Sequence, residues 1–487
     1  MKNLKDILYK VAVEAVYGST DRFINTIAFD SRNITENGLF VAIKGTLTDG
    51  HAFIEDVIRK GAKVIICQHI PSSKIEGVTY VVVNNTNTAL AIIAANFYDN
   101  PSKKLKLVGI TGTNGKTTIA SLLYSLFTKA GYKSGLLSTV KVMVDTKAFP
   151  ATHTTPDSIT INRFLDQMVS AGVAYCFMEV SSHGIDQKRS EGLHFSGGIF
   201  TNLSHDHLDY HNTFASYRDV KKSFFDALPK SAFALVNIDD KNGGVMLQNT
   251  KAKKVTYALK TIADYKAKIL ENQFNGLLLT INNHEVWAKL IGNFNAYNLL
   301  AIYATADLLG VETLENLRLI SELESVSGRF QYTISKGGIT AIVDYAHTPD
   351  ALKNVLETIN AIRTLNEKVI TVVGCGGDRD KSKRPKMAHI ASELSNQAIF
   401  TSDNPRTEDP QSIISDMETG VAPQNFKKTL SIVDRKQAVK TAVQLAEKGD
   451  ILLIAGKGHE SYQEVNGVKT DFDDYKIVTT LFKELEK

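Results

Sequence analysis

Residues 108–118 read Val-Gly-Ile-Thr-Gly-Thr-Asn-Gly-Lys-Thr-Thr. An apolar, strand-like run leads into the glycines, and a helix-like run over 119–130 follows them. A strand, a glycine-rich loop and a helix N-terminus together form a phosphate-binding loop, whose backbone N–H groups face a polyphosphate. In such a loop Lys116 reaches the outer phosphates and the Thr117 hydroxyl binds Mg²⁺. The stretch therefore predicts that the chain binds ATP.

This loop departs from the common pattern at one position. Where that pattern has its first glycine the chain has Ile110, and its glycines stand at Gly109 and Gly112 instead. A chance Gly-Lys-Thr in a surface turn is the alternative, but it would not be flanked by a strand and a helix. The residues expected at the nucleotide are Gly112, Thr113, Asn114, Gly115, Lys116, Thr117 and Thr118.

Length, composition and charge bound the class of protein. A chain of 487 residues has room for two to four domains, and 43% hydrophobic with 22% charged residues is ordinary for a globular protein. A net charge of +4 gives no bulk electrostatic footprint for nucleic acid. The three cysteines, Cys67, Cys176 and Cys375, lie far apart and are expected to be reduced thiols. The chain has no apolar span of 18 residues, so we expect a cytoplasmic protein without membrane insertion.

Three segments follow one another, and together they predict an α/β fold of three domains. Segment 1–100 mixes strand-like and helix-like runs and ends in a turn cluster at Asp99–Ser102. Segment 101–328 alternates strands and helices, which predicts a central, mononucleotide-binding parallel sheet, with β-hairpins inserted over 254–291. Segment 329–487 alternates again and predicts a doubly wound, Rossmann-like domain.

Two polar motifs end strands of the central segment. Glu179, in Met-Glu-Val-Ser-Ser-His, is suited to bind Mg²⁺ or position water opposite a phosphate loop, although an N-capping cluster explains the motif equally well. Three histidines and two aspartates within residues 205–211 indicate a metal. The usual spacings and cysteines of a zinc site are missing, so a Mg²⁺ or phosphate role fits better. A solvated polar loop is the alternative.

Lys221 lies in a helix-like run over 214–228. Four apolar residues share its helix face: Phe214, Tyr217, Phe225 and Leu228. Burial there would lower the pKa of the amine, and a neutral amine can react with CO₂ to give a carbamate, which is a metal-binding carboxylate. A lysine that snorkels to solvent is the alternative, and the residues alone favour it.

Further polar motifs precede or follow elements of the last two segments. Asn295 is a candidate N-cap and Asn298 is a candidate to contact an adenine edge, although capping alone explains most of this motif. Four motifs, at 343–350, 374–381, 403–406 and 456–460, end successive strands of the third segment. Open α/β sheets bind ligands beyond the carboxyl ends of their strands, so we expect the active site where the domains face each other. Arg379 and Arg406 are suited to form bidentate pairs with carboxylates.

The ordered set of motifs resembles the Mur ligase family over nearly the whole chain. The motifs are FDSR (29–32), GTNGKTT (112–118), THTTP (152–156), MEVSSH (178–183), TNLSHDHLDYH (201–211), GRF (328–330), VDYAHTPD (343–350), GCGGDRDKSKRP (374–385), DNPR (403–406) and GKGHE (456–460). The DNPR box is similar to that of family members that add meso-2,6-diaminopimelate, whereas lysine-adding relatives typically lack its final arginine.

The resemblance implies an amide ligase of peptidoglycan precursor synthesis that uses ATP and Mg²⁺. In the family, the free carboxylate of UDP-N-acetylmuramoyl-L-alanyl-D-glutamate attacks the γ-phosphate of ATP. The amine of the incoming amino acid then displaces phosphate from the acyl phosphate. We expect a monomer. The implied catalytic residues are Lys116, Glu179, His207 and Lys221, with Thr117 and Glu179 at one Mg²⁺ and His207 and carbamylated Lys221 at the second.

The resemblance also assigns the remaining binding residues. Asn298, Arg329 and Asp344 would hold ATP. The UDP-sugar-peptide would contact Ser31, Thr154, Thr155, Ser181, Gln187 and Arg189. Diaminopimelate would bind at Arg379, Asp403, Asn404, Pro405, Arg406, Gly456 and Glu460, with Arg406 as a fork for its distal carboxylate.

Three alternatives remain open at this point. The first is a lysine-adding ligase of the same family, and the second is a folylpolyglutamate synthetase-like ligase, in which FDSR, DNPR and GKGHE are not expected together. The third is an inactive, ATP-regulated binding protein. Retention of Lys116, Glu179, His207 and Lys221 argues against it.

Overall fold

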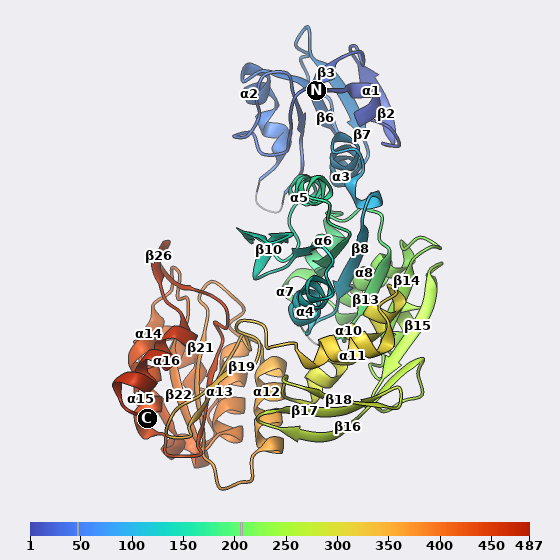
Figure 1. The fold of residues 1–487 in the computed structure, drawn as a ribbon. Helices are drawn as coiled ribbons and strands as arrows, with labels where there is room; N and C mark the ends of the chain where they lie inside the picture. Colours follow the sequence, from blue (N-terminus) through green and yellow to red (C-terminus); the bar gives the residue numbers. More distant parts are fainter. Residues whose placement is uncertain (46–47, 205, 207) are drawn as a thin grey trace. The chain divides into compact units, whose positions relative to one another are not determined.

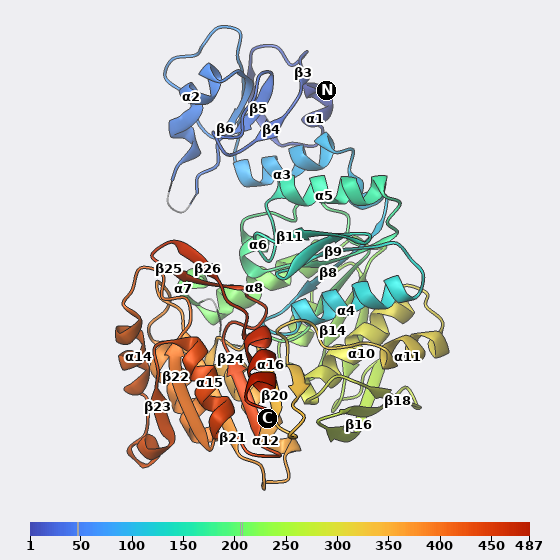
Figure 2. The same ribbon diagram turned by 60° about the vertical axis from the view of Figure 1, so that its left-hand side comes forward.

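A computed structural model describes residues 1–45, 48–204, 206 and 208–487 (Figures 1 and 2). The chain forms two compact units: 1–112 with 123–201 and 215–256, and 113–122 with 202–214 and 257–487. Helices α4 (Lys116–Lys129) and α8 (Phe214–Asp226) begin in the second unit and end in the first. Strands alternate with helices and most strand pairs are parallel, which confirms the predicted α/β class.

The first unit begins with a five-stranded sheet of order β2-β7-β6-β5-β4, parallel except for β2 at the edge. Its apolar strands are buried by α1 and α3 on one face and by α2 on the other, as expected for parallel strands covered on both sides. The elements are α1 (Leu4–Ile7), β2 (Val13–Tyr17), β4 (Ile27–Ala28), β5 (Gly38–Val41), α2 (Ile54–Arg59), β6 (Ala62–Cys67), β7 (Thr79–Val83) and α3 (Thr86–Phe97).

A second sheet of the first unit carries the predicted phosphate loop. Its strands run in the order β11-β10-β9-β12-β8-β13-β14, and the five from β9 to β14 are parallel. The central strand, β8, leads directly into the loop. The elements are β8 (Lys106–Thr111), β9 (Ser134–Leu137), β10 (Lys141–Val144), β11 (Lys147–Pro150), α5 (Ser158–Ser170), β12 (Tyr175–Glu179), α6 (Ser182–Asp186), β13 (Gly197–Phe200), β14 (Phe233–Asn237) and α9 (Gly243–Met246).

Gly109 is not part of the phosphate loop, so its sequence-based placement there is wrong. It lies within β8, where an added Cβ would come within 2.6 Å of the Phe224 ring and 2.9 Å of the Phe195 ring. The glycine therefore lets α8 pack closely on the strand, and Gly112 and Gly115 are the glycines of the loop.

The second unit contains an antiparallel meander, which confirms the predicted hairpins. β16 (Tyr265–Gln273), β17 (Gly276–Ile281) and β18 (His284–Ala288) pair in sequence, and β15 (Lys253–Ala258) joins β16 in parallel. The turn at Asn282 and Asn283 has φ of 45° and 71°, the left-handed conformation that a two-residue hairpin requires. Helices α7 (Leu208–His211), α10 (Asn293–Leu308) and α11 (Thr313–Ser321) belong to the same unit.

The carboxyl-terminal sheet confirms the predicted doubly wound domain. Its order is β19-β20-β24-β21-β22-β23, with every strand parallel except β19. One face packs on α12, α13 and α14 and the other on α15 and α16. The elements are β19 (Gln331–Ile334), β20 (Thr340–Asp344), α12 (Pro349–Ile362), β21 (Val369–Cys375), α13 (Lys383–Leu394), β22 (Gln397–Ser402), α14 (Pro410–Glu418), β23 (Thr429–Ser431), α15 (Arg435–Leu445), β24 (Ile451–Ala455) and α16 (Asp474–Glu484).

This strand order explains why four polar motifs meet at one edge. The last strand, β24, is inserted between β20 and β21, so the loops that follow β20, β24, β21 and β22 lie side by side at the carboxyl end of the sheet. Such a switch in strand order is where open α/β sheets bind ligands.

Cys67, Cys176 and Cys375 are all buried and unpaired. Across the described ranges, no helix has the length and apolar character needed to cross a membrane.

Candidate functional site

Hydrogen bonds join the phosphate loop to the segment that follows β13. Thr113 N donates to Asn202 O at 2.8 Å, and Asn114 N donates to Asn202 Oδ1 at 3.0 Å. The Asn202 amide in turn donates to Asn114 O at 3.2 Å, and Ser204 N donates to Thr113 Oγ1 at 3.0 Å. Asn202 thus positions the loop, a role that we did not predict from the sequence. Its place at a strand end, one residue after a threonine, was the available signal.

The loop glycines have positive φ angles, and the lysine side chain bonds back to the loop. Gly112 has φ of 146° and Gly115 has φ of 89°, so a side chain at Gly115 would be strained. Lys116 Nζ donates to Thr113 O at 2.7 Å. The ammonium therefore caps its own loop, close to where the phosphates of a nucleotide are expected.

In the second unit, Arg329 contacts the start of the helix that follows this loop, and Asp344 lies within the electrostatic influence of Arg329. Arg329 Nη2 donates to Thr117 Oγ1 at 3.2 Å, and its guanidinium lies 4.6 Å from the centre of the Tyr345 ring. Asp344 Oδ2 accepts from Phe330 N at 2.6 Å. Gly328, with φ of 65°, allows the Arg329 segment to reach this position, because an added Cβ would come within 2.0 Å of His459 N.

Burial raises the pKa of Asp344 to about 6 from a usual 3.8, although Arg329 and the Phe330 N–H oppose the shift. Because the pKa is higher in the folded than in the unfolded chain, the folded state binds more protons between these values. Stability therefore falls as pH rises from about 4 to 6, by about 2–3 kcal/mol.

We predict that Asp344→Asn removes the fall in folding stability that the buried Asp344 carboxylate causes as pH rises. The Tm difference between variant and wild type should grow in favour of the variant from pH 4 to pH 7.5, because the amide keeps an acceptor for Phe330 N without the buried charge. Thermal unfolding at several pH values measures it. A constant difference across that range would contradict the assignment.

The candidate N-cap at Asn295 is wrong. Helix α10 begins at Asn293 with Gly292 in the N-cap position, and Asn295 lies in the first turn. Its amide donates to Ile291 O at 2.8 Å and its Oδ1 accepts from Asn298 Nδ2 at 2.9 Å. Asn295 therefore orients the Asn298 amide, which is 6% exposed.

Lys221 is buried, which excludes the snorkelling alternative. The residue is 1% exposed, and Nζ donates to Gly112 O at 3.0 Å and lies 3.5 Å from Thr111 Oγ1. The ammonium also lies over the Tyr217 ring at 4.8 Å. A buried amine that contacts the first residue of the phosphate loop is consistent with a catalytic role.

The predicted metal residues are described only in part. His207 lies outside the described residues, so its position remains a prediction. Within the described part of the chain, no three His, Cys, Asp or Glu side chains come together as a metal cluster.

A second polar cluster surrounds the end of β12 in the first unit. Glu179 is fully buried, and its Oε1 accepts from Thr139 N at 2.7 Å. Thr155 Oγ1 donates to Glu179 O at 2.8 Å and accepts from Ser181 N at 2.9 Å. Thr154 Oγ1 lies 3.1 Å from Thr139 Oγ1. The structure therefore brings the motifs at 152–156 and 178–183 into contact.

Arg189 and Gln187 extend this cluster. Arg189 Nη1 donates to Thr155 O at 2.6 Å, and Nη2 donates to Gln187 Oε1 at 2.7 Å. Ser31 is not part of it: the residue follows β4 in the amino-terminal sheet, where its carbonyl accepts from Lys60 Nζ at 3.1 Å.

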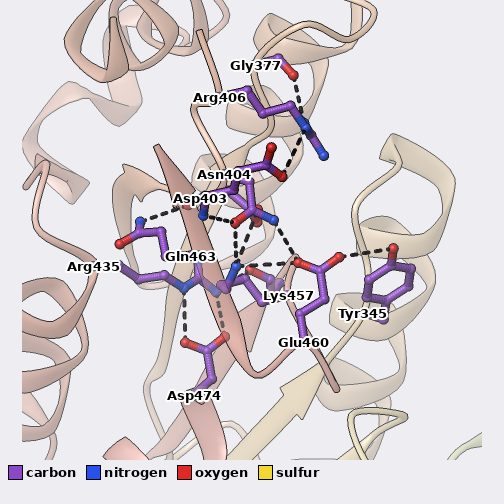
Figure 3. A network of polar contacts seen from close by, with 12 residues as sticks. Tyr345, Gly377, Asp403, Asn404, Arg406, Arg435, Lys457, Glu460, Gln463 and Asp474 are labelled. Atoms are coloured by element: carbon purple, nitrogen blue, oxygen red, sulfur yellow. Dashed lines mark hydrogen bonds and ion pairs between the residues drawn. The ribbon is translucent and has the colours of Figure 1, made fainter. Parts of the chain in front are cut away.

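The third cluster lies at the carboxyl end of the last sheet (Figure 3). Asn404 Nδ2 donates to Glu460 Oε2 at 2.8 Å, and Asp403 and Asn404 are 8% and 2% exposed. An added Cβ at Gly456 would come within 2.8 Å of Asp403 Oδ2, so this glycine admits the carboxylate. Lys457, which the sequence analysis did not single out, is fully buried among these residues.

Arg406 lies at the rim of this cluster in a constrained conformation. Its φ is 52°, and Nη1 donates to Gly377 O at 2.7 Å (Figure 3). Arg379 is exposed, and both arginines flank Gly376, where an added Cβ would lie 3.0 Å from Arg406 Nη1 and 3.8 Å from Arg379 Cγ. The Arg406 guanidinium also lies 3.9 Å from the Glu464 carboxylate, so this arginine pairs with a residue of the chain itself at the rim of the cluster.

A hairpin that we did not predict holds the Arg406 loop. Strands β25 (Tyr462–Val465) and β26 (Val468–Asp471) pair across Asn466 and Gly467. Arg406 N donates to Glu464 O at 3.1 Å, and Asn466 N donates to Arg406 O at 2.7 Å. The Asn-Gly pair was a strong hairpin signal in the sequence.

Known proteins can now be compared with this chain. Three family models match: "Mur ligase family, catalytic domain" at residues 23–98, "Mur ligase middle domain" at 110–306 and "Mur ligase, glutamate ligase domain" at 328–458. A protein of Cytophaga hutchinsonii is 54% identical over 485 residues, 99% of this chain and 100% of its own length. One of Phocaeicola vulgatus is 53% identical over 479 residues, 98% of this chain and 99% of its own. Both are named "UDP-N-acetylmuramoyl-L-alanyl-D-glutamate--2,6-diaminopimelate ligase".

A solved structure agrees with these relatives. A structure titled as the same diaminopimelate ligase has a TM-score of 0.71 and 30% identity, and covers 100% of this chain and 99% of its own. The family and enzyme class predicted from the ordered motifs are confirmed. The chain is an ATP-dependent ligase and belongs to the Mur ligase family.

Proposed function

We propose that this ligase joins meso-2,6-diaminopimelate to UDP-N-acetylmuramoyl-L-alanyl-D-glutamate through an acyl phosphate, in peptidoglycan precursor synthesis. The observation that carries the proposal is the charge arrangement of the third cluster. There the Arg406 guanidinium lies beside a loop that buries Asp403 and Asn404 against Glu460. An acceptor with a distal carboxylate and a distal ammonium complements both signs of charge.

The phosphate loop accounts for the ATP half of the reaction. Its backbone N–H groups and Lys116 would bind the phosphates, while Arg329, Asp344 and Asn298 would hold the rest of the nucleotide. Arg329 already reaches the Thr117 hydroxyl, which links the nucleotide loop to the segment that precedes β19. Two anions must approach each other in this reaction, so cationic groups are needed to neutralise them.

The donor chemistry of the site suits Mg²⁺. The Thr117 hydroxyl and the buried Glu179 carboxylate would each supply a hard oxygen ligand. The family resemblance assigns these two residues to one ion and assigns carbamylated Lys221 and His207 to a second. When bound, the ions would neutralise charge on the transferred phosphoryl group. Thr111 Oγ1, which lies 3.5 Å from Lys221 Nζ, is placed to donate a hydrogen bond to a carbamate oxygen.

The second polar cluster is proposed to bind the nucleotide-sugar substrate. Thr154, Thr155, Ser181, Gln187 and Arg189 present hydroxyl, amide and guanidinium groups that suit a diphosphate and a peptide carboxylate. Ser31 would contact the uridine end from the amino-terminal sheet.

Domain boundaries at 1–100, 101–328 and 329–487 are proposed, supported by the three matched family models. A monomeric, cytoplasmic enzyme is proposed as well.

An acceptor panel tests the function. With ATP, Mg²⁺ and the UDP-muramoyl dipeptide, phosphate release should require an acceptor and should be fastest with meso-diaminopimelate. L-Lysine lacks the distal carboxylate that would pair with Arg406, so we expect kcat/KM for L-lysine to be lower by about a hundredfold or more. Equal turnover with L-lysine would favour the lysine-adding alternative, and turnover with a folate and glutamate would favour the folylpolyglutamate alternative. Absence of turnover with every acceptor would favour the inactive binding protein.

A further inference from the structure

Lys457 is a fully buried ammonium within the third cluster (Figure 3). Nζ donates to Asn404 Oδ1 at 2.9 Å and to Glu460 Oε2 at 3.4 Å, and it lies 3.9 Å from Asp403 Oδ1. The Tyr462 ring lies 5.6 Å from this nitrogen. Removing an ammonium from water is costly, so its burial here requires compensation by these oxygens.

Lys457 fixes the direction of the Asn404 amide. Asn404 Oδ1 accepts from Lys457 Nζ and from Glu464 N, both at 2.9 Å, so the amide nitrogen must point the other way. That nitrogen donates to Glu460 Oε2 at 2.8 Å. Reversing the amide would place its N–H groups against two donors.

The same contacts make the two oxygens of Glu460 unequal. Oε2 accepts from Asn404 Nδ2 and Lys457 Nζ, whereas Oε1 accepts from the Tyr345 hydroxyl at a long 3.4 Å. A carboxylate oxygen can accept more than one hydrogen bond. Oε1 is therefore the oxygen best placed to accept a strong bond from an incoming ammonium.

The local charges also balance to leave room for one cation. Asp403 and Glu460 contribute two negative charges and Lys457 one positive charge, and the Arg406–Glu464 pair adds no net charge, which leaves one negative charge. The neighbouring buried pair Arg435 and Asp474 is neutral, with bonds of 2.9 and 2.7 Å, and Arg435 also donates to Ala455 O at the end of β24. It supports the strand that precedes Lys457 without changing the net charge.

We propose that Lys457 is a positioning residue for the amino-acid acceptor: it orients Asn404 and Glu460 so that Glu460 Oε1 receives the acceptor's distal ammonium. This inference rests on the proposed function. Lys457 acts through its neighbours and need not touch the acceptor.

Lys457→Met tests the inference, with Lys469→Met as the matched control. Lys469 also lies over the Tyr462 ring, at 4.3 Å, but its side chain is exposed. We expect KM for diaminopimelate to rise about tenfold or more in Lys457→Met, as for loss of hydrogen bonds to a charged group. KM for ATP and for the UDP-muramoyl dipeptide should stay within about twofold, as should hydroxylamine-trapped acyl phosphate formed without acceptor. Lys469→Met should match wild type.

Rescue by a conservative variant separates positioning from a merely structural role. In a merely structural role, loss of the ammonium would weaken the binding of every substrate and not of the acceptor alone. Lys457→Gln keeps a donor without the charge, and it should restore part of the affinity for diaminopimelate while KM for ATP stays at the wild-type value. It also serves if the methionine variant does not fold.

The possible outcomes separate the two proposals. If wild type does not ligate diaminopimelate, the proposed function fails. If wild type does, but the folded Lys457 variants keep the wild-type KM for diaminopimelate, or raise all three KM values together, the positioning role is overturned.

Discussion

Lys221→Ala should lower kcat for ligation by about a thousandfold. Nζ of Lys221 contacts Gly112 O at the start of the phosphate loop, and a carbamate there would supply a negatively charged metal ligand where the transferred charge must be stabilised. Removing a single preorganised electrostatic group of this kind costs about 10²–10³ in kcat. Acetate or formate should raise kcat of the variant at least about tenfold, since truncation leaves space beside Thr111 for a small carboxylate. Phosphate release with saturating substrates measures both effects.

Lys222→Ala is the matched control for this experiment. Lys222 is the next residue of α8 and forms an ion pair with Asp226 at 2.6 Å, away from the loop. It should keep wild-type kcat and show no response to acetate. Full activity of Lys221→Ala without added carboxylate would remove the carbamate from the mechanism.

Arg406→Ala should raise KM for diaminopimelate by about thirtyfold or more. Truncating one partner of a hydrogen-bonded charge pair costs about 2–5 kcal/mol, because the other charge is left unpaired. Arg406 has φ of 52°, a left-handed conformation that costs alanine and arginine about the same, so the substitution should change backbone strain little. Steady-state kinetics with varied diaminopimelate measure the effect.

Arg406→Lys refines this test. It keeps the positive charge but loses the planar fork, so its KM should lie between those of wild type and Arg406→Ala. KM for ATP should be unchanged in both variants. An unaltered KM for diaminopimelate in Arg406→Ala would contradict the fork assignment.

The sequence was sufficient where local chemistry dictates structure. A glycine-rich loop between an apolar strand and a helix defined the phosphate site, and Asn282-Asn283 defined a hairpin turn. Lys221 was the informative case. Helical spacing placed it on an apolar face, whereas lysine side chains in general are expected to be exposed to solvent. The structure buries it against Gly112, so the periodicity outweighed the general tendency of lysine to remain exposed.

Partners that are distant in sequence could not be predicted in the same way. Asn202 is 88 residues from its partner Asn114 in the phosphate loop, and Arg435 is 39 residues from Asp474. Each pair becomes adjacent only through strand order, which a single sequence specifies weakly. Asn295 was misassigned for the opposite reason, since its local signal fitted a helix cap while its actual bonds run to Ile291 and Asn298.

The main-chain hydrogen bonds that hold the Arg406 loop bear on how the choice of amino-acid acceptor can change. Gly377 N bonds to Asn404 O, and an added Cβ at Gly377 would come within 1.9 Å of Pro405 O, so two backbones are locked together before any side chain is considered. The hairpin secures the other side through N–H and C=O groups of residue 406 itself. These main-chain bonds do not depend on the side chain at position 406, so a substitution there should leave the backbone of the loop in place. A ligase with a different side chain at position 406 could therefore select a different amino acid without a change in the surrounding backbone.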